Sequence, residues 1–305
     1  MRLVLAVLAM LAPLGLAAQP SPEPLGPSIL DTDSEVVDVW SFTLPAEEGP
    51  ADRIGVLIPR RGAPEGGFPV LFLLDGQAVM ELLSDDFLAT LDPARMPVIV
   101  TLGYDTRQRF AGDARTRDYT PPDAEGGPAA DPRGRPGGGA AAFLERLRSE
   151  ILPEVTSRVA LDMDRSALWG HSYAGLFVLW AAADPASPFA RHVSASPSLW
   201  WDHGSFLGQL SAQIAAGGWR PRRLDLHKGE LERARASNPD NPNAQKLVKM
   251  RAALPEGALE ALNAELREAG VPGQLTIFLG LSHGETFRAS VLRVVGEAFS
   301  ATEAR

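Results

Sequence analysis

The segment 170–175, with the sequence GHSYAG, contains the residues of this chain that are best placed to do chemistry. Its serine, Ser172, lies between very small residues, and apolar runs precede and follow it. This pattern is typical of a nucleophile elbow, a sharp strand-to-helix turn that exposes the serine hydroxyl and directs the following backbone N–H groups towards it. The strict pattern is G-x-S-x-G, but here Ala174 takes the last position and Gly175 follows it. The alternative is a Gly–Ser turn that caps an ordinary helix.

A serine nucleophile needs a base to accept its proton, and histidine titrates in the right range. Where such an elbow is used in a mostly parallel sheet, the chain order is serine, acid, histidine. His283 follows the last apolar segment, 274–279, and precedes the last helical segment, 285–299, so we predict that His283 is the base. His171 and His227 are assigned to packing, and His192 is assigned to packing or the surface. His203, which follows the aromatic cluster, is assigned to a substrate contact.

The acid is expected after the strand that ends near residue 227, where the sequence KGELE supplies two carboxylates. We prefer Glu232, because a glycine three residues before it lets the side chain turn back under the histidine. Glu230 remains the alternative within this segment. A solvated acidic turn with no part in the chemistry is the simpler interpretation of both.

An acyl-transfer reaction needs two backbone donors for its oxyanion. We predict that the first is the N–H of Tyr173, directly after the serine. The second is predicted in the loop after the apolar strand 69–74, at Gly76 or Gln77, because a glycine there permits close approach. The alternative for this loop is a simple Asp–Gly turn.

Apolar runs and helical spacings alternate along the chain and predict an α/β fold. Runs such as 69–74 and 97–102 are continuously apolar, which is typical of strands covered on both faces. The expected architecture is a mostly parallel central sheet with an antiparallel start, flanked by helices. Besides the strand before the elbow, strands are predicted at 36–44, 53–59, 69–74, 97–102, 192–196, 223–227 and 274–279. Helices are predicted at 77–91, 140–155, 206–216, 244–269 with a break at Pro255, and 285–299.

Composition limits the classes of protein that this chain can represent. With 305 residues, 45% of them hydrophobic, it can bury the core of one large domain. The net charge of −9, from 38 acidic and 29 basic residues, argues against a nucleic-acid binder. The absence of cysteine excludes disulfides and a cysteine nucleophile. Neither a metal site nor a cofactor is expected.

The first residues have the pattern of a secretory signal peptide, with a basic start, an apolar run at 3–16 and small residues up to 18. The run is shorter than the roughly 20 residues that a membrane-spanning helix needs. We therefore expect a secreted, periplasmic protein with no membrane span after cleavage. Residues 1–18 are assigned to the signal peptide, 19–34 to an extended tail and 35–302 to a single domain. Within it, residues 105–139 are rich in Gly, Pro, Asp and Arg and predict one long loop.

Several sequence blocks together resemble the “Putative esterase” family that contains the siderophore esterases. GHSYAGLFVL at 170–179 resembles the family's elbow GHSYGGLF, and SPSLWW at 196–201 resembles its strand-end motif. Four more blocks follow the family's order: LDG at 74–76, RTRDYTP at 115–121, GELE at 229–232 and SHG at 282–284. The resemblance covers residues 36–299 and implies an α/β-hydrolase with Ser172 as nucleophile and His283 as base. Some relatives resemble Ser–His dyads, which leaves the role of Glu232 open.

The resemblance also implies an activity, the hydrolysis of carboxylic esters through an acyl-enzyme without a cofactor. Relatives cleave trilactone iron chelators of the enterobactin or bacillibactin type, so the implied substrate is a small ester such as a ferric catecholate siderophore. In that fold Arg115, Arg117, Trp200 and Trp201 would lie near the site. Arginines suit anionic oxygens and tryptophans suit flat rings. An equally open interpretation is that Arg117 fixes the loop internally and that the tryptophans are packing residues.

Two other functions are compatible with the sequence. Other branches of the family act on acyl or acetyl esters, and Ala174 together with the Gly/Pro-rich insertion at 123–138 departs from the family's pattern near the pocket. A non-catalytic periplasmic binding protein could also be built on a hydrolase scaffold. The complete pair of Ser172 and His283 argues against that last function, because a binding protein would be free to lose either residue.

Overall fold

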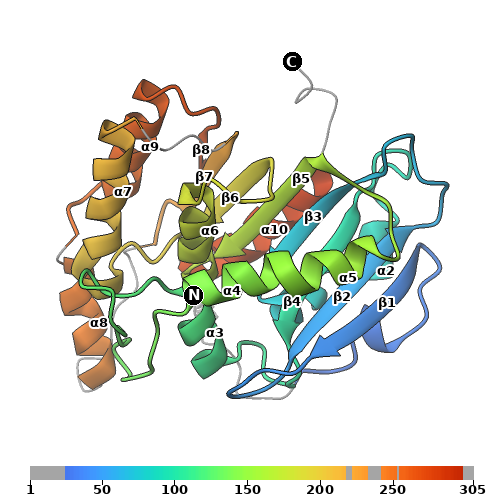
Figure 1. The fold of residues 1–305 in the computed structure, drawn as a ribbon, viewed down its shortest axis with the longest axis horizontal. Coiled ribbons are helices and arrows are strands. Elements are labelled where there is room, and N and C mark those ends of the chain that lie inside the picture. The colour runs from blue at the N-terminus through green and yellow to red at the C-terminus, as the bar shows by residue number, and fades with distance from the viewer. Residues whose placement is uncertain (1–24, 218–221, 233–241, 253, 298–305) are drawn as a thin grey trace, which may run out of the picture.

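The central feature of the fold is an eight-stranded sheet with the order β1-β2-β4-β3-β5-β6-β7-β8 (Figure 1). The computed structural model describes residues 25–217, 222–232, 242–252 and 254–297. β1 pairs antiparallel with β2, and β2 with β4, whereas all later pairings are parallel, so the predicted α/β fold with an antiparallel start is confirmed. The strands are β1 (Val37–Leu44), β2 (Asp52–Pro59), β3 (Phe68–Leu74), β4 (Val98–Tyr104), β5 (Leu161–His171), β6 (Arg191–Ala195), β7 (Leu224–Gly229) and β8 (Leu275–Phe278).

Helices cover both faces of this sheet and enclose two apolar clusters. In Figure 1, α4 (Ala140–Arg146), α5 (Leu152–Thr156) and α6 (Tyr173–Ala183) lie in front of the sheet and α10 (His283–Glu297) lies behind it. Because both faces are covered, every residue of β3 and β4 is buried, as their continuous apolar sequences predict. The remaining helices are α1 (Gly76–Met80), α2 (Asp85–Leu88), α3 (Gly112–Tyr119), α7 (Ser205–Ala215), α8 (Pro242–Ala252) and α9 (Ala258–Glu268).

Two of the predicted helices differ from a single regular α-helix in the structure. The segment 77–91 forms the separate helices α1 and α2, because the hydroxyl of Ser84 accepts a hydrogen bond from the N–H of Phe87 and begins a new helix there. The segment 140–155 is continuous, but a π-helical turn, Leu147–Ile151, joins α4 to α5.

β8 is less buried than its apolar sequence predicts. Ile277 in this strand is 44% exposed, and Leu279 directly after it is 78% exposed. The physical reason is position, since β8 is the last strand in the sheet order and pairs only with β7 among the described elements. An apolar run identifies a strand, but it does not say whether that strand is central or at the edge.

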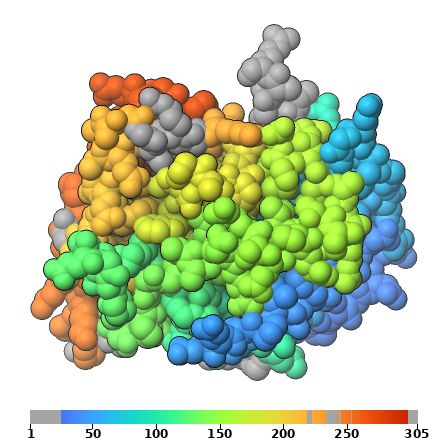
Figure 2. All heavy atoms as spheres, in the orientation of Figure 1, coloured from blue at the N-terminus to red at the C-terminus, as the bar shows by residue number. Residues whose placement is uncertain are grey.

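The segment 105–139 differs from the single long loop that was predicted, because it contains the helix α3. This helix packs against α4 and α6. Its buried side chains include Arg115, Thr116 and Asp118, so its sequence shows no apolar period that could have revealed it. The residues after α3 are held by local bonds, among them a bridge between Ala130 and Pro136. In the space-filling view, this segment and the helices that follow it form a continuous band across the molecule (Figure 2).

The N-terminal part of the described chain is docked onto the sheet. Ser28 and Asp31 form a capping box around a short 3-10 helix, Ile29–Asp31, and Ile29 is buried. The described part of the segment predicted as an extended tail is therefore packed against the domain. The segment predicted as a signal peptide, 1–18, lies outside the described residues. None of the described helices is both long enough and apolar enough to cross a membrane.

Candidate active site

Ser172 lies in a strained turn between β5 and α6. Its φ of 63° and ψ of −115° are rare for a residue with a side chain, and such strain is found mainly at functional sites. A Cβ atom on Gly170 would lie 2.5 Å from the carbonyl oxygen of Ala174, and one on Gly175 would lie 2.6 Å from that of Ala195. The turn therefore depends on both glycines. Ala174 replaces the last glycine of the strict pattern without a clash because Gly170 has no side chain.

The hydroxyl of Ser172 faces the loop that follows β6. Its Oγ lies 3.2 Å from Oγ of Ser198, and the N–H of Ser198 donates to the Ser172 carbonyl at 3.1 Å. The N–H of Ser172 donates to the carbonyl of Ala195 at 3.0 Å. The sequence motif SPSLWW indicated this loop, but it did not indicate that Ser198 would contact Ser172. The elbow is thus anchored on the neighbouring strand.

His283 lies at the start of α10, beside the elbow. Nε2 of His171 is 2.9 Å from the carbonyl oxygen of His283, and the two imidazole rings are 4.6 Å apart. Burial, with further contributions from His283 and Arg115, holds the pKa of His171 well below its usual value, so its ring is neutral. With a carbonyl as its partner, Nε2 of His171 must donate. His171 is therefore a buried, neutral donor that holds the backbone of the predicted base next to the elbow.

A second contact fixes the start of α10. The carboxylate of Glu285 accepts hydrogen bonds from the N–H of Ser282, at 2.9 Å, and from its hydroxyl, at 2.6 Å. This arrangement resembles the second half of a capping box, and it defines where the helix begins. His283 is the first residue of that helix, so its backbone direction is set from both sides.

The two candidate acids lie on one turn after β7 but have different partners. Glu232 is partly buried, and its Oε1 accepts from the hydroxyl of Ser196 and from the N–H of Gly229, the latter at 2.9 Å. Glu230 is exposed and accepts from the N–H of Gly280 at 2.8 Å. Between them, the N–H of Leu231 donates to the carbonyl of residue 281 at 2.9 Å, which ties the turn to the loop that carries His283.

The predicted oxyanion donors lie at two helix starts on neighbouring strands. Tyr173 begins α6 after β5, and Gly76 begins α1 after β3, which pairs with β5. A Cβ on Gly76 would lie 3.0 Å from the backbone of Gly103, so this position also needs glycine. The side-chain amide of Gln77 donates to the carbonyl of Tyr104 at 2.7 Å and fixes the loop. Unpaired N–H groups at helix starts suit a developing negative charge.

Arg115 connects the β3–α1 loop (residues 75–77) with the elbow. Its guanidinium donates to both carboxylate oxygens of Asp75, at 2.8 and 2.7 Å, and more weakly to the carbonyl of His171, at 3.5 Å. It also lies over the ring of Tyr173, 5.2 Å from its centroid. Burial alone would lower the pKa of Arg115, but Asp75 offsets this and the pKa is raised. Arg115, which was predicted to bind substrate, is thus buried and paired with a carboxylate of the protein itself.

Arg117, the second arginine predicted to bind substrate, also has protein partners. Its guanidinium donates to both carboxylate oxygens of Asp118, at 2.7 and 2.9 Å, and to the carbonyl of Glu48 at 2.6 Å. These contacts agree with the alternative that the sequence left open, in which Arg117 fixes its own segment internally. The contacts hold α3 against the turn between β1 and β2.

The two predicted tryptophans pack behind the elbow. Trp201 is completely buried, and its indole N–H donates to the carbonyl of Pro121 at 2.9 Å. Trp200 is 8% exposed, with its ring 5.7 Å from that of Tyr173. The hydroxyl of Tyr173 in turn lies 3.5 Å from the carboxylate of Asp131. Trp201 therefore has a packing position, and it joins the insertion after α3 to the helix that follows Ser172.

The sheet order, the helices on both faces and the strained serine between β5 and a buried helix define an α/β-hydrolase of the serine hydrolase class. A family model described as “Putative esterase” matches residues 51–289. The chain belongs to this family, and within it to the siderophore-esterase branch. It is accordingly an enzyme that hydrolyses carboxylic ester bonds.

Named relatives and solved structures agree with this assignment. The chain is 32% identical to an apo-salmochelin esterase of Escherichia coli O6:H1, over 90% of this chain and 83% of the relative. It is 30% identical to the ferri-bacillibactin esterase BesA of Bacillus subtilis, over 72% of this chain and 78% of the relative. The solved structure titled “Enterobactin and Salmochelin Hydrolase IroE” superposes with a TM-score of 0.68 at 29% identity, over 88% of this chain and 99% of that one.

Proposed function

We propose that this protein is an exported serine esterase that opens the ester bonds of siderophores, with Ser172 as its nucleophile. The observation that carries the proposal is the strained Ser172, held at the start of a buried helix beside the loop of His283. The strain is maintained by two glycines and by backbone bonds to the next strand, so the backbone of the turn is held in this conformation. The names of the relatives supply the substrate class.

The proposed reaction proceeds through an acyl-enzyme. His283 accepts the proton of Ser172 as Oγ attacks the ester carbonyl, and the protonated imidazole then gives that proton to the departing alkoxide. The N–H of Tyr173 and an N–H of the β3–α1 loop, at Gly76 or Gln77, stabilise the oxyanion. A water molecule then gives its proton to His283 and attacks the acyl carbon. Breakage of the acyl–Ser172 bond releases the acid and returns the proton to the serine.

Glu232 is the acid that we assign to this machinery. It is less exposed than Glu230, and it holds the ends of β6 and β7 together through Ser196 and Gly229. In this role it orients the loop of His283 and favours the imidazolium form of the base. A Ser–His dyad that works without the acid is the alternative, and it predicts a small effect of removing the carboxylate.

A substrate panel tests the proposed activity. Wild-type protein and Ser172→Ala are assayed with a catecholate trilactone, with and without bound iron, and with p-nitrophenyl acetate and butyrate. We expect kcat/KM for the trilactone to exceed that for acetate by at least about 100-fold, a difference in transition-state stabilisation of roughly 3 kcal/mol. Turnover of the simple esters alone would instead make the protein a general acyl or acetyl esterase.

Export is tested separately from activity. The full chain is expressed in a bacterium with two membranes, and the mature N-terminus is determined by mass spectrometry of the periplasmic fraction. Cleavage after residue 17 or 18 is expected from the small residues at that point. Protein that stays in the cytoplasm with an uncleaved N-terminus would contradict the export proposal and leave the esterase activity unaffected.

A further inference from the structure

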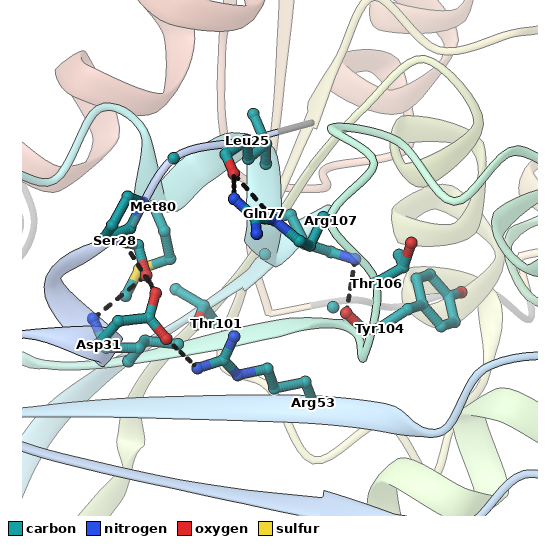
Figure 3. A pocket seen from close by; sticks show the side chains of 15 residues that line it. Leu25, Ser28, Asp31, Arg53, Gln77, Met80, Thr101, Tyr104, Thr106 and Arg107 are labelled. Atoms are coloured by element: carbon teal, nitrogen blue, oxygen red, sulfur yellow. Dashed lines mark hydrogen bonds and ion pairs between the residues drawn. The ribbon is translucent and has the colours of Figure 1, made fainter. Parts of the chain in front are cut away.

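A cavity of about 320 Å³ lies against the β3–α1 loop, and neither Ser172 nor His283 lines it (Figure 3). In the sheet, β3 lies between β5, which leads to Ser172, and β4, whose end lines the cavity. Gly76 and Gln77 of the loop are themselves lining residues. The cavity is therefore lined by the same loop that supplies a proposed oxyanion donor, whereas Ser172 is not among its lining residues.

The outer wall of the cavity is the N-terminal strap, residues 25–31. One end is fastened by three hydrogen bonds to Arg107: the N–H of Leu25 donates to the Arg107 carbonyl at 2.8 Å, and two guanidinium nitrogens of Arg107 donate to the Leu25 carbonyl at 2.8 and 3.3 Å. The other end is fastened by the ion pair between Asp31 and Arg53, at 2.7 Å. This pair, together with bonds from Ser28, lowers the pKa of Asp31 to about 2. The strap is thus attached to the domain at both ends, and it forms one wall of the cavity.

Two glycines leave room for side chains that form the cavity walls. A Cβ on Gly55 would lie 2.7 Å from both δ-methyl groups of Leu30, so Leu30 rests directly on the backbone of β2. A Cβ on Gly103 would collide with Oε1 of Gln77, so that amide rests on β4. Larger residues at either position would displace a wall of the cavity.

The lining has the chemistry of an amphipathic site with one cationic end. Leu30 and Met80 offer an apolar surface, and Met80 is only 5% exposed. The charge of Arg53 is neutralised by Asp31, whereas Arg107 is exposed at the edge and has no carboxylate partner among the described residues. Two bonds to Leu25 leave guanidinium donors of Arg107 available. The volume is about twice that of an engineered 150 Å³ cavity that binds benzene.

We propose that this cavity binds a small amphipathic carboxylate, with the carboxylate on Arg107 and the apolar body on Leu30 and Met80. Ester hydrolysis releases acids of this class, so the reaction product is the natural source of the ligand; in this respect the inference rests on the proposed function. A bound acid touches Gln77 and so lies against the loop that supplies an oxyanion donor. Its binding is a property of the cavity and does not require turnover.

Binding is tested with 3-phenylpropionate as the probe and 3-phenylpropionamide as its neutral counterpart, by isothermal titration calorimetry. The protein is the mature chain, both as wild type and as Ser172→Ala. Arg107→Gln removes the charge but keeps a donor for the Leu25 carbonyl, and Met80→Trp fills the cavity. Arg95→Gln is the matched control, because Arg95 is an exposed arginine outside the lining that forms an ion pair with neighbouring Asp92 at 3.5 Å. Circular dichroism and thermal unfolding check that each variant folds.

We expect Arg107→Gln and the neutral amide each to weaken binding by about tenfold, which is the contribution of one charged hydrogen bond. Met80→Trp should abolish binding, whereas Arg95→Gln and a covalent phosphonate on Ser172 should leave it unchanged. No measurable binding, equal binding by Arg107→Gln, or loss of binding on phosphonate labelling would overturn the proposal, the last by placing the acid in the catalytic pocket. Arg107-dependent binding by a protein that hydrolyses no ester would refute the proposed function alone.

Discussion

Arg115 and Asp75 form a buried, two-pronged ion pair that joins two loops of the active site. The guanidinium comes from α3, and the carboxylate belongs to a residue that adopts a left-handed conformation, with φ of 55° and ψ of 48°, at the end of β3. Asp75 is 2% exposed and Arg115 is 9% exposed. The pair therefore fixes the position of the β3–α1 loop relative to the carbonyl of His171, the residue before the nucleophile.

Loss of this pair should damage both stability and turnover. Arg115→Met leaves the Asp75 carboxylate buried without a partner, which costs about 3–5 kcal/mol. Arg115→Lys keeps the charge but loses the two-pronged geometry, so we expect a smaller loss of stability and a clear loss of kcat. Chemical unfolding and steady-state kinetics measure the two effects. Arg117→Met is the comparison and should cost less than Arg115→Met, because Arg117 is itself partly exposed and Asp118 keeps a hydrogen bond from the hydroxyl of Tyr104.

Ser172→Ala should remove at least about 10³-fold of the ester hydrolysis rate, because no other hydroxyl occupies the strained turn. Ser198→Ala should lose only about fivefold, since it removes one hydrogen bond to Ser172 Oγ, worth about 1 kcal/mol. The rates are compared on a chromogenic ester at saturating substrate. More than a tenth of wild-type activity in Ser172→Ala, or a larger loss in Ser198→Ala, would mean that the nucleophile has been assigned to the wrong serine.

His283→Ala should be as damaging as the serine change, because the same proton transfer is lost. Glu232→Gln should cost roughly 10- to 100-fold, less than the roughly 10⁴-fold seen when a strict triad loses its acid. Single-turnover rates separate these cases from effects on product release. Glu230→Gln is the matched control on the same turn. A wild-type rate in Glu232→Gln together with a large loss of rate in Glu230→Gln would make Glu230 the acid.

Folding stability should fall in mild acid because buried histidines resist protonation. Burial lowers the pKa of His192 to about 4, against an ordinary value of 6.5. The unfolded chain therefore binds a proton first, so the contribution of His192 is complete above pH 6.5 and is lost as the pH falls towards 4. The loss is about 3 kcal/mol.

His192→Gln should remove this part of the pH dependence. In urea unfolding between pH 4 and 7, the free energy of unfolding of His192→Gln should depend less steeply on pH than that of the wild type. The difference in slope should correspond to at most one proton. The exposed His203→Gln controls for the loss of an imidazole elsewhere in the chain. His227, whose pKa burial also lowers to about 4, contributes in the same window and should keep part of the slope in His192→Gln. An unchanged slope would show that His192 is protonated equally in both states.

The strands and the elbow were predictable because their signals are local. β3 and β4 are buried on both faces, and a run of apolar residues directly reports that burial. Gly170 and Gly175 are needed by the backbone of the turn itself, so the requirement appears in adjacent residues of the sequence. The chain order of serine, carboxylate and histidine followed from the same strand and helix pattern.

The partners of the site residues were not predictable in this way. Arg115 was interpreted as a substrate ligand because an arginine in a polar segment shows no preference between a substrate and a protein carboxylate. Only the folded chain brings it to Asp75, 40 residues earlier, and brings His171 to the carbonyl of His283, 112 residues later. The helix α3 was missed for a related reason, since three of the side chains that it buries, Arg115, Thr116 and Asp118, are polar and leave no apolar period in the sequence.

The sequence by itself determined the α/β architecture, the strained serine and the family, because periodic burial and tight backbone turns select residue types position by position. The tertiary structure alone decided that Arg115 pairs with a buried carboxylate of the protein, that both Trp200 and Trp201 are buried and where a cavity remains beside the β3–α1 loop. Those outcomes depend on side chains that meet within hydrogen-bond distance only after the sheet has assembled. Such distances are a property of packing between remote segments, which no local pattern encodes.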